Sequence, residues 1–234
     1  MEDVLGVHLE GTYDQPHAYI EVTDERLKPG TLDMPHLVEA GFAFARPIAE
    51  DVEVLAKLQK IYLRSDGKFL LRWSPVGEDS GYPAITLRKV GAGWAVYLAG
   101  QVFRGYQVKN QWNLKHIIAN LLNALIEERL VEEVEAPAWL EVVVTLQALP
   151  DAGGKTRTLV HLVNHHGNRP VDGNNVCVEQ VLPVRDITVR LRHAVRPTQV
   201  TLEPGGQRTD WEYVDGIVKV HIPEVHIHTV IAIT

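Results

Sequence analysis

The clearest pattern of hydrophobic positions lies near the middle of the chain, in NLKHIIANLLNALIEER (113–129). Its aliphatic residues recur at steps of three and four: Leu114, Ile117, Ile118, Leu121, Leu122, Leu125 and Ile126. This spacing places them along one stripe of a helix. We therefore predict an amphipathic helix over 114–128 that packs its stripe onto a sheet, with Asn113 as the N-cap residue.

Alternation of apolar and polar residues marks strands before this helix. The segment YPAITLRKVGAGWAVYLAG (82–100) holds two alternating runs around Gly91-Ala92-Gly93, a pattern that predicts a β-hairpin. AYIEV (18–22) alternates as a short strand, and Pro29-Gly30 marks a turn. VEVLAKLQKIYL (52–63) fits either a strand or a helix.

After the acidic segment EERLVEEVEAPAW (127–139), only strand patterns follow. Gly, Pro, Asn and Asp separate them at spacings typical of a β-sandwich. We predict a domain boundary in the acidic segment, with one domain over 1–135 and a β-sandwich over 138–234. The expected strands are LEVVVTLQAL, TRTLVHLVNH, DITVRLRH, TQVTLEP, WEYV, IVKVHI and HTVIAI.

Composition narrows the classes of function. The 234 residues are 45% hydrophobic and 23% charged, a balance that suits a globular protein with a buried core. The net charge of -7 and the lack of a basic run argue against binding to nucleic acid or to an anionic membrane. The N-terminus lacks the apolar core of a signal peptide, and no apolar run approaches the roughly 20 residues of a membrane span. We therefore expect a cytoplasmic protein.

The histidines are the first candidates for chemistry. TLVHLVNHHGNRP (158–170) holds His161, His165 and His166, and the C-terminal part holds His226 and His228 as an H-x-H pair. Such a pair on a strand suits a metal ion. A metal site also needs further ligands and groups that orient the imidazoles, and the sequence fixes none. We favour a structural role for these histidines, at positions in strands and turns, and this interpretation implies no metal and no cofactor. His161, His226 and His228 are the metal ligands of the alternative, a small metal-dependent hydrolase.

Other reactive groups give weaker signals. Cys177 is the single cysteine, which excludes an intramolecular disulfide, and it lacks the strand-to-helix elbow of a nucleophile. Glu78, Asp79 and Ser80 precede an expected strand and suit a turn or a surface better than a catalytic carboxylate pair. The acidic segment 127–135 is typical of a solvated face. A carbohydrate-binding module would expose two or three aromatic residues on one face of the sandwich. The sequence shows no common face for four of its tryptophans, which are Trp94, Trp112, Trp139 and Trp211.

Two segments resemble a known family. YPAITLRKVGAGWAVYLAGQVFRGY and NLKHIIANLLNALIEE resemble the end of the β-galactosidase trimerisation domain, and EDVLGVHLEG (2–11) resembles a segment inside it. The β-rich tail resembles the small β-sandwich that follows this domain in family 42-like glycoside hydrolases. The resemblance implies an α+β chain, in which a partial flavodoxin-like or amidotransferase-like α/β domain precedes an antiparallel β-sandwich.

In that family, a (β/α)8 barrel that carries two catalytic glutamates comes first. The 234 residues have no room for such a barrel, so the resemblance carries over no catalytic residue. It implies a non-catalytic accessory or oligomerisation region, the C-terminal portion of a larger glycoside hydrolase. Its partners would be further copies of the chain or the missing barrel. A carbohydrate-binding module, with a carbohydrate ligand, and the metal-dependent hydrolase are the alternatives.

Overall fold

The structure is a computed structural model that describes residues 2–39, 41–63, 74–109, 111–149, 156–165 and 180–234. Cys177 and His166 lie outside the described residues. The chain divides into two compact units, Met1–Glu127 and Glu128–Thr234, called here the first and the second unit. Each unit has its own hydrophobic core. Among the described helices, none is long and apolar enough to cross a membrane.

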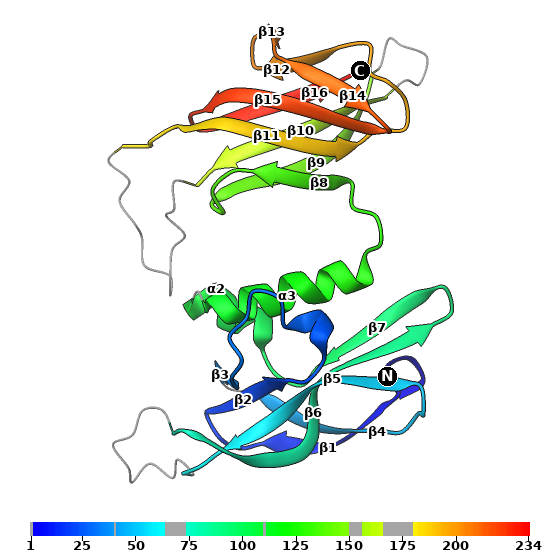
Figure 1. The fold of residues 1–234 in the computed structure, drawn as a ribbon, viewed down its shortest axis with the longest axis vertical. Helices are drawn as coiled ribbons and strands as arrows, with labels where there is room; N and C mark the ends of the chain where they lie inside the picture. The colour runs from blue at the N-terminus through cyan, green and yellow to red at the C-terminus, as the bar shows by residue number, and fades with distance from the viewer. Residues whose placement is uncertain (1, 40, 64–73, 110, 150–155, 166–179) are drawn as a thin grey trace. The chain divides into compact units, whose positions relative to one another are not determined.

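The first unit is built on antiparallel strands (Figure 1). One sheet has the order β3-β2-β5-β6-β7, and a second, two-stranded sheet joins β1 to β4. The strands are β1 (Val7–Tyr13), β2 (His17–Val22), β3 (His36–Glu39), β4 (Phe42–Pro47), β5 (Val52–Ile61), β6 (Val76–Val90) and β7 (Gly93–Leu98). The described helical segments are α1 (Glu2–Leu5), the short 3₁₀ helix η1 (Glu25–Leu27), α2 (Val102–Lys109) and α3 (Trp112–Leu125).

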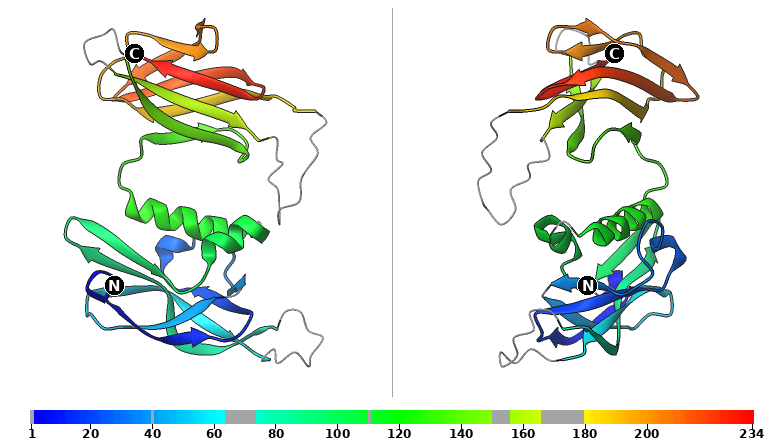
Figure 2. Two further views of the ribbon diagram at one scale, coloured as in Figure 1. Left: turned by 180° about the vertical axis from the view of Figure 1, so that it is seen from behind. Right: turned by 60° about the vertical axis from the view of Figure 1, so that its left-hand side comes forward.

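The prediction of a flavodoxin-like α/β domain is wrong. Every described strand pair of the first unit is antiparallel. A parallel sheet needs a crossover, usually a helix, between its strands. Here α2 and α3 both follow the last strand, so neither of them can serve as a crossover. Both helices lie on one face of the strands in both views of Figure 2.

Several local predictions for the first unit are confirmed. The hairpin pairs β6 with β7 from Ile85↔Leu98 to Val90↔Gly93, and Gly91 in its turn has a positive φ of 59°. The ambiguous segment 52–63 forms the strand β5, which lies between β2 and β6. The position expected for Glu78–Ser80 is wrong, because these residues lie within β6 and not ahead of a strand.

The predicted helix is confirmed as α3, although it ends at Leu125, and part of its stripe packs against the sheet, whereas Leu122 and Ile126 are exposed. Leu114, Ile117 and Leu121 are buried in one core with side chains from β2 and β5. The predicted cap is wrong, because Gln111 takes the N-cap position without a side-chain hydrogen bond. Asn113 instead ties the helix to a distant loop, because its Oδ1 accepts a hydrogen bond of 3.2 Å from the backbone N–H of Leu32.

The second unit is a β-sandwich, as expected for the tail. Two antiparallel sheets, with the orders β13-β12-β16-β10-β9 and β14-β15-β11-β8, enclose one core of aliphatic side chains. All seven expected strands are present. The strands are β8 (Val131–Glu135), β9 (Leu140–Ala148), β10 (Thr156–Asn164), β11 (Val184–Arg192), β12 (Val200–Glu203), β13 (Gln207–Arg208), β14 (Trp211–Val214), β15 (Ile217–Val225) and β16 (His228–Ile233).

The acidic segment forms part of this sandwich. β8 pairs with β11, and its glutamates lie beside arginines of that strand. Arg192 is 2.6 Å from Glu132, and Arg190 is 3.5 Å from Glu133. The acidic run is therefore an ion-paired edge strand, and its glutamates are exposed to solvent, as its composition predicted.

Candidate functional site

A cleft of about 830 Å³ opens in the first unit, where β1, β4, β5 and β6 come together. Its volume falls in the range of about 300–1,000 Å³ that is typical of small-molecule sites. The lining combines aromatic rings with charged and amide groups. The lining residues are Tyr13, Asp14, Gln15, Phe44, Lys60, Ile61, Tyr62, Val76, Gly77 and Glu78.

Tyr13 and Phe44 form one wall of the cleft, and Tyr82 lies against Phe44 outside the lining. Tyr13 and Phe44 meet edge to face with ring centroids 5.7 Å apart, and Phe44 stacks on Tyr82 at 4.6 Å. The Tyr13 hydroxyl oxygen accepts a hydrogen bond of 3.1 Å from the backbone N–H of Ile61. These contacts fix the rings in place, because aromatic pairs favour such edge and offset geometries.

Behind this wall, Glu10 binds both Arg46 and Tyr82. Arg46 Nε donates at 2.8 Å, and the Tyr82 hydroxyl donates at 2.6 Å. These hydrogen bonds, with that from Arg46 the stronger, lower the pKa of Glu10 to about 2. Glu10 is thus an anion at neutral pH and serves to hold Tyr82, whereas a general acid needs a pKa near the working pH.

Ion pairs between β5 and β6 border the cleft. Lys60 lies 3.0 Å from Glu78, and Lys57 lies 3.2 Å from Asp79. A hydrogen bond from the backbone N–H of Gly81 is the largest cause that lowers the pKa of Asp79. These residues of β6 therefore form a charged strand surface, and Asp79 has the opposite of the raised pKa that general-acid catalysis requires.

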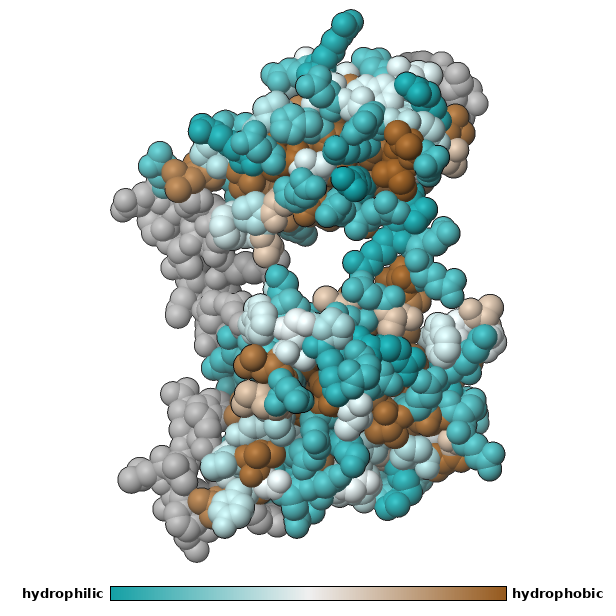
Figure 3. Space-filling view, in the orientation of Figure 1, coloured by the Kyte–Doolittle hydropathy of each residue, from teal (hydrophilic) through white to brown (hydrophobic). Residues whose placement is uncertain are grey.

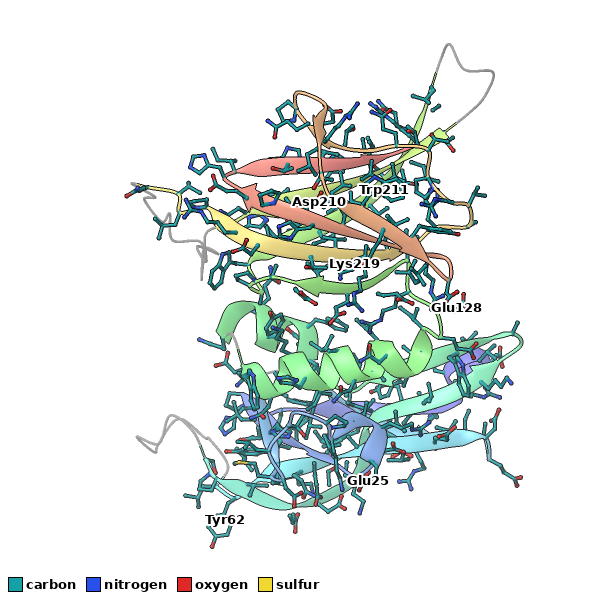
Figure 4. The ribbon with its side chains drawn as sticks, turned by 45° about the horizontal axis from the view of Figure 1, so that its top comes forward. Glu25, Tyr62, Glu128, Asp210, Trp211 and Lys219 are labelled. Atoms are coloured by element: carbon teal, nitrogen blue, oxygen red, sulfur yellow. The ribbon has the colours of Figure 1, made fainter. Side chains whose placement is uncertain are left out.

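Tyr62 and Gly77 shape the open end of the cleft. The Tyr62 residue is 72% exposed, directly after β5, and its side chain extends from the margin of the unit into solvent (Figure 4). A Cβ atom on Gly77 would lie 2.8 Å from the carbonyl carbon of Ile61 and 2.9 Å from the backbone nitrogen of Tyr62. Only glycine allows the backbones of β5 and β6 to approach this closely beneath the cleft.

The structure brings two of the three candidate metal ligands together. His161 Nδ1 and His228 Nε2 are 3.3 Å apart, in rings that are parallel to within 6°. The two rings are stacked, with their centroids 5.4 Å apart. The N···N distance of 3.3 Å suits a hydrogen bond between the two imidazoles.

His226 lies apart from this pair. It occupies the bend between β15 and β16, so the expectation that His226 and His228 share one strand face is wrong. Its Nε2 lies 3.2 Å from the carbonyl oxygen of Val181, and His165 contacts Glu141 at 2.5 Å. Within the described residues, no three His, Cys, Asp or Glu side chains are grouped so as to hold a metal ion.

The tryptophans form no shared platform on the sandwich. Trp211 packs partly against the sandwich core, with the Arg196 guanidinium 5.9 Å from its ring. It lines a shallow pocket of about 300 Å³, and the other side chains of this lining are charged groups or an imidazole. Figure 4 labels three of the lining residues, Asp210, Trp211 and Lys219. The aromatic cluster lies instead in the first unit, and no sequence pattern predicted its members. These are Tyr13, Phe44, Tyr62 and Tyr82.

The comparisons with known proteins give a structural match but no sequence match. No family model matches the chain, and no curated protein matches its sequence. Among solved structures, α-L-fucosidase isoenzyme 2 from Paenibacillus thiaminolyticus is similar, with a TM-score of 0.71 and 20% sequence identity. The match covers 98% of this chain and 33% of that chain. The chain thus spans about a third of the length of that enzyme and has the fold of a portion of a glycoside hydrolase.

Proposed function

We propose that the chain is a non-catalytic accessory region of a glycoside hydrolase, which supports or oligomerises the catalytic part. The observation that carries this proposal is the match of 98% of the chain to one third of an α-L-fucosidase. The strands that the structure describes pair antiparallel in both units, whereas a catalytic barrel is built from parallel βα repeats. The finer assignment to family 42-like β-galactosidases rests on the hairpin and helix sequences alone.

The chemistry of the described side chains supports a non-catalytic part. Glu10 is held anionic by Arg46 and Tyr82, and Asp79 has a lowered pKa. Glu78 at the cleft is paired with Lys60. The alternative of a metal-dependent hydrolase gains no third ligand beside His161 and His228 in the described part of the chain.

A strand edge of the second unit supports association with a further copy of the chain. β9 is an edge strand of nine residues whose single charge is Glu141, and Val143 and Leu146 on it are 41% and 74% exposed. The other edge strands of the sandwich are shorter, and β8 is acidic. Natural edges are blunted by charge or shortness, so β9 is the edge most suited to pairing.

On the face shown in Figure 3, hydrophobic residues form small groups between hydrophilic ones, with no broad apolar patch.

We therefore expect the purified chain to self-associate, and Leu146→Lys to weaken this association by about tenfold or more, or about 1.4 kcal/mol. The lysine places a charge on the edge without disturbing the core, because Leu146 is already exposed. Sedimentation equilibrium measures both effects.

Val195→Lys is the matched control, since Val195 is 70% exposed but lies in the loop after β11. It should associate like the unaltered protein. A clean monomer of the unaltered chain at high micromolar concentration would count against the oligomerisation role. Association that Leu146→Lys leaves unchanged would exclude the β9 edge.

A further inference from the structure

We propose that the cleft of the first unit is a binding site for a neutral oligosaccharide. This inference goes beyond the accessory role, and it rests on the proposed function only for the choice of sugars to test. The site is the 830 Å³ cleft bordered by Tyr13, Phe44 and Tyr62, with Lys60 and Glu78 at its rim. It is open to solvent at Tyr62, so a chain of sugar rings can enter without unfolding of the unit.

The lining has the two surfaces that a sugar ring needs. A pyranose has apolar C–H faces, which pack on aromatic rings, and a periphery of hydroxyl groups that both donate and accept hydrogen bonds. Tyr62 offers an exposed ring, and Phe44 and Tyr13 form the fixed aromatic wall. Lys60 can donate to a hydroxyl and Glu78 can accept from one. Pockets of this kind combine an apolar lining with a few placed polar groups.

The charges at the cleft favour a neutral ligand over an anionic one. Among the described residues that line it, Lys60 is the single cationic one, against the two carboxylates of Asp14 and Glu78. Phosphorylated ligands reward clusters of Lys and Arg, and the described part of this lining holds no such cluster. An acyl chain would remove water from the charged and amide groups of the same lining, which is costly.

The aromatic wall is organised before any ligand arrives. Phe44 lies between Tyr13 and Tyr82, and Tyr82 is itself held by Glu10 and Arg46. Gly77 fixes the close approach of β5 and β6 beneath the site. Binding therefore orders few side chains, which lowers the entropic cost of association. The pocket at Trp211 is smaller, at about 300 Å³, and Trp211 is the one indole or phenyl ring among its described lining residues.

The test uses the full chain with three neutral probes, which are 2′-fucosyllactose, lactose and cellotriose. Saturation-transfer NMR detects contact, and isothermal titration calorimetry measures the dissociation constant. We expect at least one probe to bind, and Tyr62→Ala to weaken that binding by about tenfold or more, because the stacking ring is lost. Tyr62→Phe keeps the ring and should stay within about threefold of the unaltered protein.

Phe103→Ala removes another exposed aromatic ring of the same unit, on α2, and should leave binding unchanged. Circular dichroism checks that every variant is folded. The proposal is overturned if none of the probes binds at 10 mM, about the weakest range that calorimetry resolves, or if Tyr62→Ala binds like the unaltered chain. Neither result affects the accessory role, which depends on association and on the absence of turnover.

Discussion

Replacement of Leu121 by Ala is expected to lower the free energy of unfolding of the first unit by about 2–5 kcal/mol. Leu121 lies on α3 and is 4% exposed, in a core that also contains Ile20 and Leu58 of the sheet. Its truncation removes buried methyl groups and leaves a cavity between the helix and the strands, and both losses destabilise the folded state. Urea unfolding, monitored by hydrogen-exchange mass spectrometry, measures the change in the free energy of unfolding in the α3 segment itself.

Leu122→Ala provides the matched control on the same helix. Leu122 is 39% exposed, so its truncation leaves little cavity and should cost less than about 1 kcal/mol. Equal losses at the two positions would mean that α3 does not present the described face to the sheet. A loss well under 1 kcal/mol at Leu121 would contradict the packing directly.

Replacement of Leu162 by Ala should have an effect of similar size, about 2–5 kcal/mol, on the second unit. Leu162 is fully buried on β10, which is paired on both sides by β9 and β16. The strands on either side hold the backbone in place, so the cavity cannot collapse easily, which favours the upper part of this range. Urea unfolding monitored by exchange of the β10 amides measures the loss.

Leu130→Ala is the control in the second unit, because Leu130 is 51% exposed. Its backbone carbonyl accepts a hydrogen bond from the backbone N–H of Arg192, and the substitution leaves this bond intact. A small loss is expected there, under about 1 kcal/mol. If Leu162→Ala were equally mild, the core between the two sheets of the sandwich would be refuted.

Local periodicity predicted the elements of this chain better than their arrangement. The stripe of α3, the β6–β7 hairpin and the sandwich strands all depend on neighbours within a few residues, and all were predicted from the sequence. Whether the first sheet is parallel or antiparallel depends on which distant strands pair. The resemblance to a trimerisation domain suggested a parallel sheet, and the antiparallel pairing of β5 with β2 and β6 corrected it.

The same limit applied to β8. Its glutamates are exposed, as predicted, but Glu132 and Glu133 also pair with Arg192 and Arg190 of β11, nearly 60 positions later in the chain. Ion pairs between strands compensate the like charges that would repel in an isolated segment. No pattern within the acidic segment itself could reveal these partners.

The cleft was hidden from the sequence for a similar reason. Tyr13, Phe44, Tyr62 and Tyr82 come from four separate parts of the first unit, and no spacing rule connects them. Only the pairing of β1 with β4 and of β5 with β6 brings these parts together. The histidines are a partial case. Strand alternation places His161 on the same face of its strand as Leu159, whereas its contact with His228 depends on the register of β10 and β16.

The central proposal is that this chain supports a glycoside hydrolase without performing the reaction itself. The most direct test is hydrolysis of a panel of nitrophenyl glycosides, including the α-L-fucoside and the β-D-galactoside, by the purified chain. The account predicts no turnover above the blank for any glycoside. Turnover that survives repurification and is abolished by Glu78→Gln, which alters a carboxylate of the cleft, would contradict it.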